Sequence, residues 1–268
     1  MRLGVIGTGT IASAIVRGLN SGTSFAGQIG VSPRNREIAA QLATEFTNVT
    51  VGRSNQVILD QSDVILLALR PQVAVDVVSA LHFRADHRVI SVVATLSYER
   101  LSELVAPATA VTKAIPLPAV AQRRGTTAIY PADTVVVELF DQLGTALPVD
   151  DESQYNALSA STAVVASCAV FAQAITSWLS MHGIKGLAAR NYVTGLLASI
   201  VDAAGSSSES FEKIAESHTT KGGLNEQLRL FLEHKGLFKA VVDGLDGVLT
   251  RVNGQIEGRS ILPVQRLP

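Results

Sequence analysis

A glycine-rich segment near the amino terminus has the clearest chemical pattern in the chain. Gly7-Thr8-Gly9-Thr10-Ile11-Ala12 follows the apolar run Leu3–Ile6 and precedes a stretch of small and apolar residues. Between a strand and a helix, the first glycine permits a tight turn, the second lets a ligand approach the backbone, and the alanine allows close packing. The start of the helix then offers unsatisfied N–H groups to an anion. The pattern predicts binding of a dinucleotide pyrophosphate, and the alternative is a turn that is only tight.

The residues after the next predicted strand indicate which dinucleotide. A site for NAD usually has Asp or Glu here, which accepts hydrogen bonds from the ribose 2′-OH. This chain has Ser32-Pro33-Arg34-Asn35-Arg36 instead, with no carboxylate. Ser32 and Asn35 can donate to a 2′-phosphate, and Arg34 or Arg36 can neutralise its charge. The segment favours NADP(H), unless the arginines only form an exposed helix start.

Two further strand ends are predicted to lie beside the same cofactor. The buried run Val64–Leu69 leads into Arg70 and Pro71, and Pro71 can open the following helix. The carboxyl ends of strands line the cofactor crevice of a doubly wound sheet. We therefore expect contacts with the nicotinamide ribose from Ala68, Leu69, Arg70 and Pro71, and we expect Ala94, after the next strand, to lie nearby.

The elements that must position these residues divide the chain into two architectures. In the first half, strand-like runs alternate with amphipathic stretches, which predicts a Rossmann-type, mostly parallel sheet with crossover helices. The predicted strands are Leu3–Ile6, Ile29–Ser32, Val64–Leu69, Arg88–Val93, Ala110–Lys113, Thr127–Tyr130 and Thr145–Val149. No proline occurs from Val149 through Leu262, where the composition is helical. The fold class is thus α/β followed by an all-α domain.

These patterns give the expected domain boundaries. Residues 1–150 form the dinucleotide-binding domain, and residues 151–252 form a helical domain for substrate binding and dimerisation. Its predicted helices are Tyr155–His182, Ile184–Ala204, Ser208–Ser217, Leu224–Glu233 and Leu237–Arg251. Residues 253–268 are expected to be a tail, because Ile256-Glu257-Gly258-Arg259 spells a protease recognition sequence often added to recombinant proteins, although the tail can equally be native.

The first predicted helix of the second half is apolar on more than one face. Such a helix must be buried on nearly all sides, which about 110 residues cannot easily achieve alone. A second copy of the chain is one cover, and neighbouring helices of the same chain are the alternative. The run Ala163–Ile175 is too short and too interrupted to span a bilayer, so we expect a core helix and no membrane partner.

Composition and charge exclude several classes of protein. The chain has 268 residues, of which 47% are hydrophobic and 17% charged, and its net charge is −1. This balance is typical of a globular protein and disfavours a nucleic-acid or polybasic membrane partner. One cysteine excludes an intrachain disulfide, and no pattern predicts a metal site. The amino terminus lacks a secretory pattern, so we expect a cytoplasmic protein.

Four segments of the first half resemble the pyrroline-5-carboxylate reductase family, whose members reduce a cyclic imino acid to proline with NAD(P)H. They are Gly7–Ile15, Asn55 followed by Asp63–Gln72, Ser91–Ala94, and Lys113–Pro118. The resemblance implies that Asn55 contacts the adenosine side of the cofactor. It also implies an intertwined helical homodimer, alone or in a larger assembly of dimers.

The second half is similar to the family more loosely. The family's S-P-G-G-T-T substrate loop corresponds to Thr220-Lys221-Gly222-Gly223-Leu224-Asn225, which keeps both glycines. The resemblance implies that N–H groups around Gly222 and Gly223 bind a carboxylate. It further implies that Asn225 and Thr220 orient the substrate. Lys221 or His218 can add positive charge for the carboxylate, and the alternative is a loop lysine that is simply solvated. The altered loop, and Ala160–Val165 in place of the family's G-S-G-P-A-Y, leave the substrate open.

Together these features predict an NADPH-dependent reductase of a small imino acid, with 1-pyrroline-5-carboxylate as the default substrate. Hydride transfer to an iminium carbon needs orientation more than ionisable groups, which suits a chain with five histidines in no paired spacing. Two alternatives remain. The chain can reduce another imino or keto acid, or it can be a catalytically silent NADP(H)-binding regulatory protein.

Overall fold

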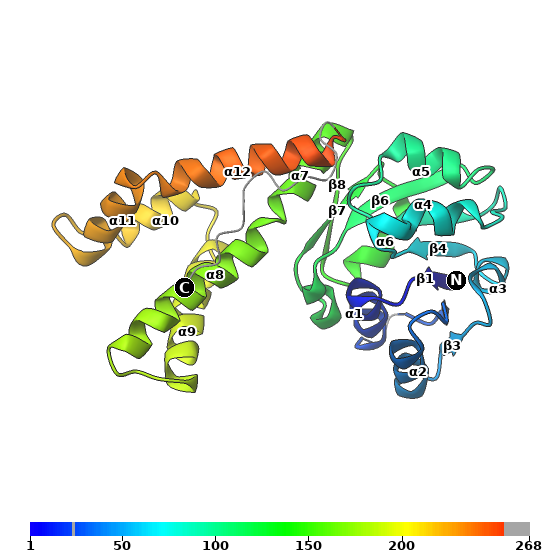
Figure 1. The fold of residues 1–268 in the computed structure, drawn as a ribbon, viewed down its shortest axis with the longest axis horizontal. Coiled ribbons are helices and arrows are strands. Elements are labelled where there is room, and N and C mark those ends of the chain that lie inside the picture. Colours follow the sequence, from blue (N-terminus) through cyan, green and yellow to red (C-terminus); the bar gives the residue numbers. More distant parts are fainter. Residues whose placement is uncertain (23–24, 255–268) are drawn as a thin grey trace. The chain divides into compact units, whose positions relative to one another are not determined.

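The computed structural model describes residues 1–22 and 25–254. The protease-like sequence Ile256–Arg259, and with it most of the predicted tail, lies outside the described residues. Two compact units share the chain (Figure 1). The sheet unit comprises Met1–Ala160 and the residues from Leu249 onward, and the helical unit comprises Ser161–Val248.

One eight-stranded sheet forms the centre of the sheet unit. Its spatial order is β3-β2-β1-β4-β5-β6-β7-β8, and every neighbouring pair is parallel except β6 with β7. This is the doubly wound order, in which the chain reverses direction across the sheet between β1 and β4. The strands are β1 (Arg2–Ile6), β2 (Gln28–Val31), β3 (Val49–Val51), β4 (Val64–Leu67), β5 (Arg88–Ser91), β6 (Ala110–Ile115), β7 (Thr126–Tyr130) and β8 (Thr145–Pro148).

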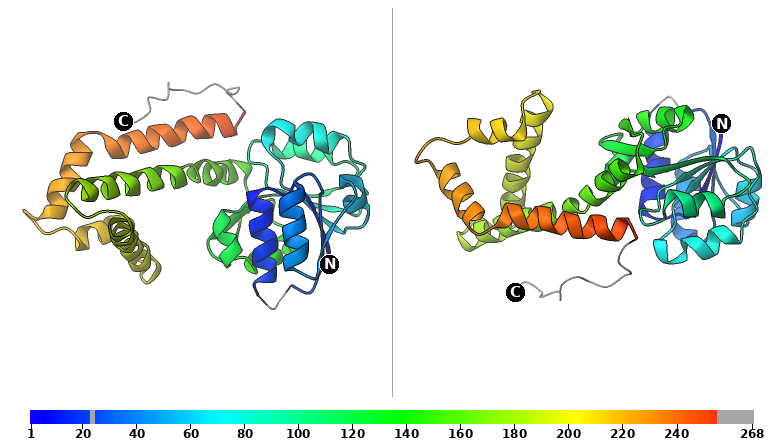
Figure 2. Two further views of the ribbon diagram at one scale, coloured as in Figure 1. Left: turned by 60° about the horizontal axis from the view of Figure 1, so that its bottom comes forward. Right: turned by 90° about the horizontal axis from the view of Figure 1, so that it is seen from above.

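Helices cover both faces of this sheet. One face packs against α1 (Thr10–Asn20), α2 (Arg36–Glu45), α6 (Thr134–Asp141) and the 3₁₀ helix η1 (Pro118–Gln122). The other face packs against α3 (Asn55–Asp60), α4 (Pro71–Ser79) and α5 (Tyr98–Leu104). Figure 2 shows α1 and α2 side by side. Each fully buried Leu or Ile side chain in these two layers stabilises the fold by about 1.5–3 kcal/mol.

The predicted α/β class is confirmed, and each predicted strand lies within two or three residues of an observed one. Sequence reasoning missed β3, because three residues are too few to show a period of two convincingly. Val49 faces the core and the following two residues are exposed, as expected for an edge strand. The long helix predicted over Tyr155–His182 is observed as α7 (Glu152–Ser161) and α8 (Val164–Met181), separated by a turn.

A buried lysine holds the start of α7 on the sheet. Lys113 on β6 is 2% exposed and donates to Glu152 Oε1 at 3.2 Å, with its ammonium 4.8 Å from the centre of the Tyr155 ring. Glu152 also accepts the backbone N–H of Tyr98 at the start of α5. Burial lowers the pKa of Lys113, and the carboxylate of Glu152 opposes that shift. One carboxylate thus joins α5, β6 and α7.

The helical unit has a very small core of its own. Its helices are α8, α9 (Leu187–Gly205), α10 (Phe211–Ser217), α11 (Leu224–His234) and α12 (Leu237–Val252), although the last turn of α12 is grouped with the sheet unit. Only Leu179, Ala189 and Val193 form a buried apolar cluster there. Large side chains such as Phe171, Trp178 and many others on these helices are exposed. The alternative that α8 is surrounded by helices of its own chain is therefore wrong.

The segment Glu152–Met181, which spans α7, the turn and α8, is also long and apolar enough to cross a bilayer, by length and composition alone. Its most apolar 18-residue window has a mean hydropathy of 1.7, and 11% of that window is buried. A helix of a soluble protein that packs against a partner has the same composition. The expected absence of a membrane partner therefore stays a prediction.

A buried histidine lies in the connection between α4 and β5. His87 is fully buried, its Nδ1 accepts the backbone N–H of Arg84 at 3.0 Å, and its Nε2 has no hydrogen-bond partner among the described residues. The Arg84 guanidinium binds the carbonyl oxygens of Asp60 and Ser62, at the end of α3. Burial lowers the pKa of His87, and the charge of Arg84 lowers it further. The ring is accordingly neutral at neutral pH.

This burial predicts a loss of stability in mild acid. The pKa of His87 is lower in the folded protein than in the unfolded chain, so the unfolded chain takes up the proton first as the pH falls below about 6.5. The free energy of unfolding should therefore decrease between pH 7 and pH 5. His87→Asn keeps an acceptor for Arg84 and should reduce this dependence, measured by thermal unfolding. The exposed His82→Asn is the control, and equal pH dependence of wild type and His87→Asn contradicts the prediction.

Candidate functional site

A hollow of about 600 Å³ lies where the strand order of the sheet reverses. It is open at the carboxyl ends of β1 and β4, the place where doubly wound sheets bind ligands. The structure brings together here residues from the turn after β1, the start of α2 and the turn after β4. They are Gly7, Thr8, Gly9, Arg34, Asn35, Arg36, Ala68, Leu69, Arg70 and Val73.

Gly7 makes the turn after β1 possible. Its φ is +99°, and a Cβ at this position would lie 2.4 Å from the carbonyl oxygen of Ala68. Its N–H donates to Ser32 Oγ at 2.9 Å, and Ser32 is 1% exposed. The Ser32 hydroxyl thus helps to hold the glycine turn as an acceptor, and its predicted donation to a 2′-phosphate stays a prediction. Thr8 is also buried and its hydroxyl is directed at the Ser32 carbonyl.

Gly9 has a different role from Gly7. A Cβ at Gly9 would meet no protein atom within 4 Å, and its φ of −89° is open to any residue. Neither packing nor backbone conformation therefore requires glycine here. A Cβ would instead project into the hollow, so the missing side chain leaves room for a ligand against the backbone. This is the fit expected for a pyrophosphate.

Of the three helices that start at the hollow, α1 and α4 have no side-chain cap, whereas α2 is capped by Asn35. In the sheet unit, α2, α3, α5 and α6 each begin with an Asn, Ser or Asp whose side chain accepts a backbone N–H. In contrast, α1 begins at Gly9 and α4 begins at Arg70, both without such a hydrogen bond. A missing cap usually costs about 1 kcal/mol. Helix N–H groups left in this way attract an anion.

The charge of the hollow is positive. Arg34, Arg36 and Arg70 line it, and none of the lining residues is acidic. These three guanidinium groups have no ion pair in the part of the chain that the structure describes. Three unpaired arginines around two uncapped helix starts favour a ligand with several phosphates. Sequence reasoning missed Val73, which lies one turn into α4.

The remaining predicted cofactor residues are not among those that line the hollow. Thr10 and Ile11 begin α1, and Ala12 is buried where α1 packs on the sheet. Pro71 is the first residue of α4, and Asn55 is the first residue of α3, after the Ser54 cap. Ala94 is exposed after β5. Their contacts with a cofactor stay predictions.

The predicted substrate loop lies in the helical unit, before α11. Gly222 has a φ of +74°, and its N–H donates to Glu226 Oε2 at 2.6 Å. The N–H of Gly223 donates to the carbonyl oxygen of Thr220 at 2.8 Å, and the Asn225 amide donates to the carbonyl oxygen of His218 at 2.7 Å. Lys221 is exposed. The loop is thus well ordered by its own hydrogen bonds, and the substrate roles of its residues stay predictions.

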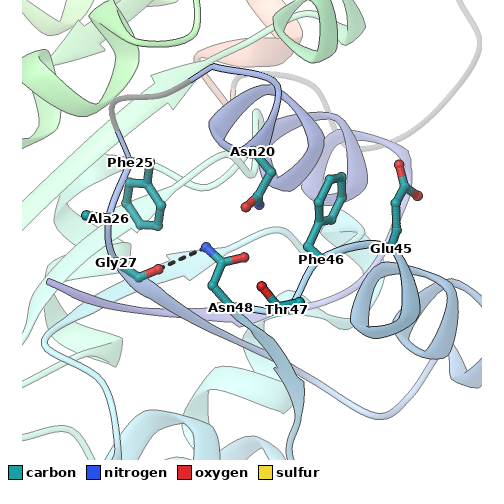
Figure 3. A pocket seen from close by; sticks show the side chains of 8 residues that line it. All are labelled: Asn20, Phe25, Ala26, Gly27, Glu45, Phe46, Thr47 and Asn48. Carbon is teal, nitrogen blue, oxygen red and sulfur yellow. Dashed lines mark hydrogen bonds between the residues drawn. The ribbon is translucent and has the colours of Figure 1, made fainter.

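A second hollow, of about 370 Å³, lies at the carboxyl ends of α1 and α2 (Figure 3). Three of its four polar side chains have partners: Asn48 donates to Gly27 O at 3.0 Å, Asn20 donates to Val16 O at 2.8 Å, and Glu45 pairs with Arg17. With these groups satisfied, this hollow does not compete with the glycine turn as a candidate site.

Comparison with known proteins points to the same region. Residues 2–95 match the family described as NADP oxidoreductase, coenzyme F420-dependent. The chain is 27% identical over 168 residues to a pyrroline-5-carboxylate reductase of Pseudomonas aeruginosa, an alignment that covers 59% of this chain and 61% of that protein. It is 29% identical over 167 residues to a pyrroline-5-carboxylate reductase of Haemophilus influenzae, an alignment that covers 59% of this chain and 60% of that protein. These alignments thus span about three fifths of the relatives' length.

Solved structures extend the likeness over nearly the whole chain. A 1-pyrroline-5-carboxylate reductase of Streptococcus pyogenes is similar with a TM-score of 0.84 and 25% identity, covering 95% of this chain and 98% of that one. A Plasmodium falciparum pyrroline carboxylate reductase with NADP bound has a TM-score of 0.82 and 15% sequence identity, and the match covers 95% of this chain and 97% of that one. The second match concerns the fold alone. The sequence motifs, the relatives and the first structure together confirm the resemblance of this chain to the pyrroline-5-carboxylate reductase family.

Proposed function

We propose that the protein is an NADPH-dependent reductase of C=N bonds, with 1-pyrroline-5-carboxylate as its default substrate. The observation that carries the cofactor half of this proposal is the hollow at the glycine turn, with its Cβ-free wall at Gly9 and its uncapped helices. The relatives named as pyrroline-5-carboxylate reductases support the substrate half.

Each part of the hollow suits a part of NADP(H). The N–H groups at the start of α1 hold the pyrophosphate against Gly9. Arg34 and Arg36 face the 2′-phosphate, which supports NADPH over NADH. Ala68, Leu69 and Arg70 lie on the nicotinamide side, after β4. When bound, the dihydronicotinamide supplies the hydride.

The substrate loop supplies orientation. Asn225 is already held by the His218 carbonyl, so its amide is fixed before a substrate arrives. Its free oxygen suits an iminium N–H, and its second amide hydrogen suits a polar substrate in general. The N-terminus of α11, with Gly223 at its cap position and no side-chain cap, faces a carboxylate together with the glycine bend. Thr220 and Lys221 complete the loop.

The exposed apolar helices call for a second copy of the chain. With only four buried apolar residues, Leu179, Ala189, Val193 and Ile214, the helical unit cannot offset its chain entropy alone. Exposed large apolar side chains lie on all five of its helices, α8 to α12, and a symmetric pairing of two copies covers such faces. We infer a homodimer, alone or within a larger assembly. The cytoplasmic location expected from the sequence is part of the same proposal.

Two glycine variants test the cofactor half. Gly9→Ala should fold with an unchanged melting temperature but weaken NADPH binding at least about tenfold, because the new Cβ takes the space of the pyrophosphate. Gly7→Ala should lower the stability itself by at least about 1–3 kcal/mol, because its φ is positive and the Ala68 carbonyl is in the way. Fluorescence titration and thermal unfolding measure the two effects. If Gly9→Ala binds NADPH like the wild type, the proposed pyrophosphate position is wrong.

An assay with 1-pyrroline-5-carboxylate and NADPH, compared with NADH, tests the reaction. We expect turnover with a preference for NADPH, and a fall in kcat/KM of about 10–100-fold in Asn225→Ala, since the substrate loses an orienting group. Gln227→Ala, on the same helix, is the matched control. No turnover beside a positive control removes this substrate. If another imino or keto acid is turned over instead, that acid replaces 1-pyrroline-5-carboxylate as the proposed substrate. Tight NADPH binding without any turnover supports a regulatory protein.

Light scattering tests the dimer. The wild type should have twice the chain mass of 28.2 kDa, or a multiple of that value. Phe171→Asp on α8 places a charge on the apolar face and should lower the mass toward that of one chain, while Val75→Asp on α4 should leave it unchanged. Circular dichroism verifies that the helices persist. A monomeric wild type that floats with lipid vesicles would show that the apolar helices serve a membrane instead.

A further inference from the structure

We propose that Glu226 is a specificity-determining residue, whose carboxylate holds the place in the substrate loop that a substrate carboxylate would take. The inference rests on the proposed function, and it narrows the substrate class. An imine without a carboxylate beside the glycine bend enters this loop freely, whereas an imino acid must first displace Glu226.

The contact that supports this proposal is short and charged. The Gly222 N–H donates to Glu226 Oε2 at 2.6 Å, which is at the strong end for a backbone amide and a carboxylate. The positive φ of Gly222 turns this N–H toward the side chain. The bend of the loop therefore binds a carboxylate already, and that carboxylate belongs to the chain.

This arrangement differs from an ordinary helix cap. In a capping box, the acidic residue at the third helical position accepts the N–H of the N-cap residue. Here the N-cap is Gly223, and its N–H bonds to Thr220 O. Glu226 reaches one residue further back, to the glycine that the sequence assigns to substrate binding.

No neighbouring cation accounts for the position of Glu226. Arg229, one turn along α11, pairs with Glu233, and Lys221 makes no ion pair among the described residues. Glu226 itself is half-buried, and its one hydrogen bond in the described part of the chain is to Gly222. The charge of Glu226 is therefore not neutralised by a side chain.

The space in front of the bend is open. A Cβ at Gly222 would meet no atom within 4 Å. A ligand can thus approach the same N–H, but a ligand carboxylate would face the carboxylate of Glu226, and two such charges repel each other. Binding of an imino acid then costs the Gly222–Glu226 hydrogen bond as well as this repulsion.

The test compares 1-pyrroline-5-carboxylate with 1-pyrroline, which lacks the carboxylate. Glu226→Gln keeps an oxygen to accept the Gly222 N–H and removes the charge. We expect the KM for 1-pyrroline-5-carboxylate to fall about tenfold with kcat little changed, and the KM for 1-pyrroline to stay the same. The control variant Glu233→Gln, on the same helix, should leave the KM values for both substrates unchanged. An equal effect on both substrates, or no effect on either, overturns the proposal and leaves Glu226 as a helix cap only.

A binding experiment separates this inference from the proposed function. We would measure the binding of L-proline and of pyrrolidine by calorimetry, with NADP⁺ present. Glu226→Gln should bind L-proline about tenfold more tightly than the wild type does, and its affinity for pyrrolidine should be unchanged. If the wild type reduces neither imine, the proposed function fails, while a gain selective for L-proline still supports the role of Glu226. If L-proline binds wild type and variant equally, or binds neither, the proposal about Glu226 is wrong even where the enzyme is active.

Discussion

The close approach of Gly7 to the end of β4 is the constraint on which the candidate site depends. A turn with positive φ lets the chain leave β1 directly beneath the Ala68 carbonyl, and Ser32 fixes the Gly7 N–H from the other side. Three parallel strands are thereby joined at one point. Because the turn is so tight, α1 starts at the edge of the sheet with its N–H groups uncovered.

The missing caps of α1 and α4 lower the stability of the fold and leave N–H groups open to an anion. Four helices of the sheet unit begin with a side chain that satisfies their first N–H groups, so such caps are available to this fold. The helices α1 and α4 lack such a cap and start at the hollow, where the capped helix α2 also begins. The unsatisfied groups are concentrated where an anion can use them, and the three arginines around the hollow add to the same field.

The helical unit follows a different physical rule. Its helices carry many exposed large apolar residues and bury only a small cluster, so the chain alone does not complete its core. Its predicted substrate loop is nevertheless ordered by hydrogen bonds of its own, from Gly222, Gly223 and Asn225. Local order in the loop and an incomplete core in the unit are compatible, since the loop depends on contacts within a few residues.

The sequence determined those features that depend on neighbours along the chain. The glycine pattern, the strand runs and the absence of proline predicted the turn at Gly7, the mostly parallel sheet and the helical half, because φ preferences and periodicity are local properties. The strand β3 escaped prediction, because three residues at an edge leave hardly any period.

Only the tertiary structure decided what the polar groups bind. Ser32 accepts the Gly7 N–H across 25 residues, and the Gly222 N–H predicted for a substrate donates to Glu226. Likewise, the exposure of α8 depends on which helices pack against it, not on its own composition. A hydrogen-bond partner is chosen by distance in space, and distance in space is set by the whole fold.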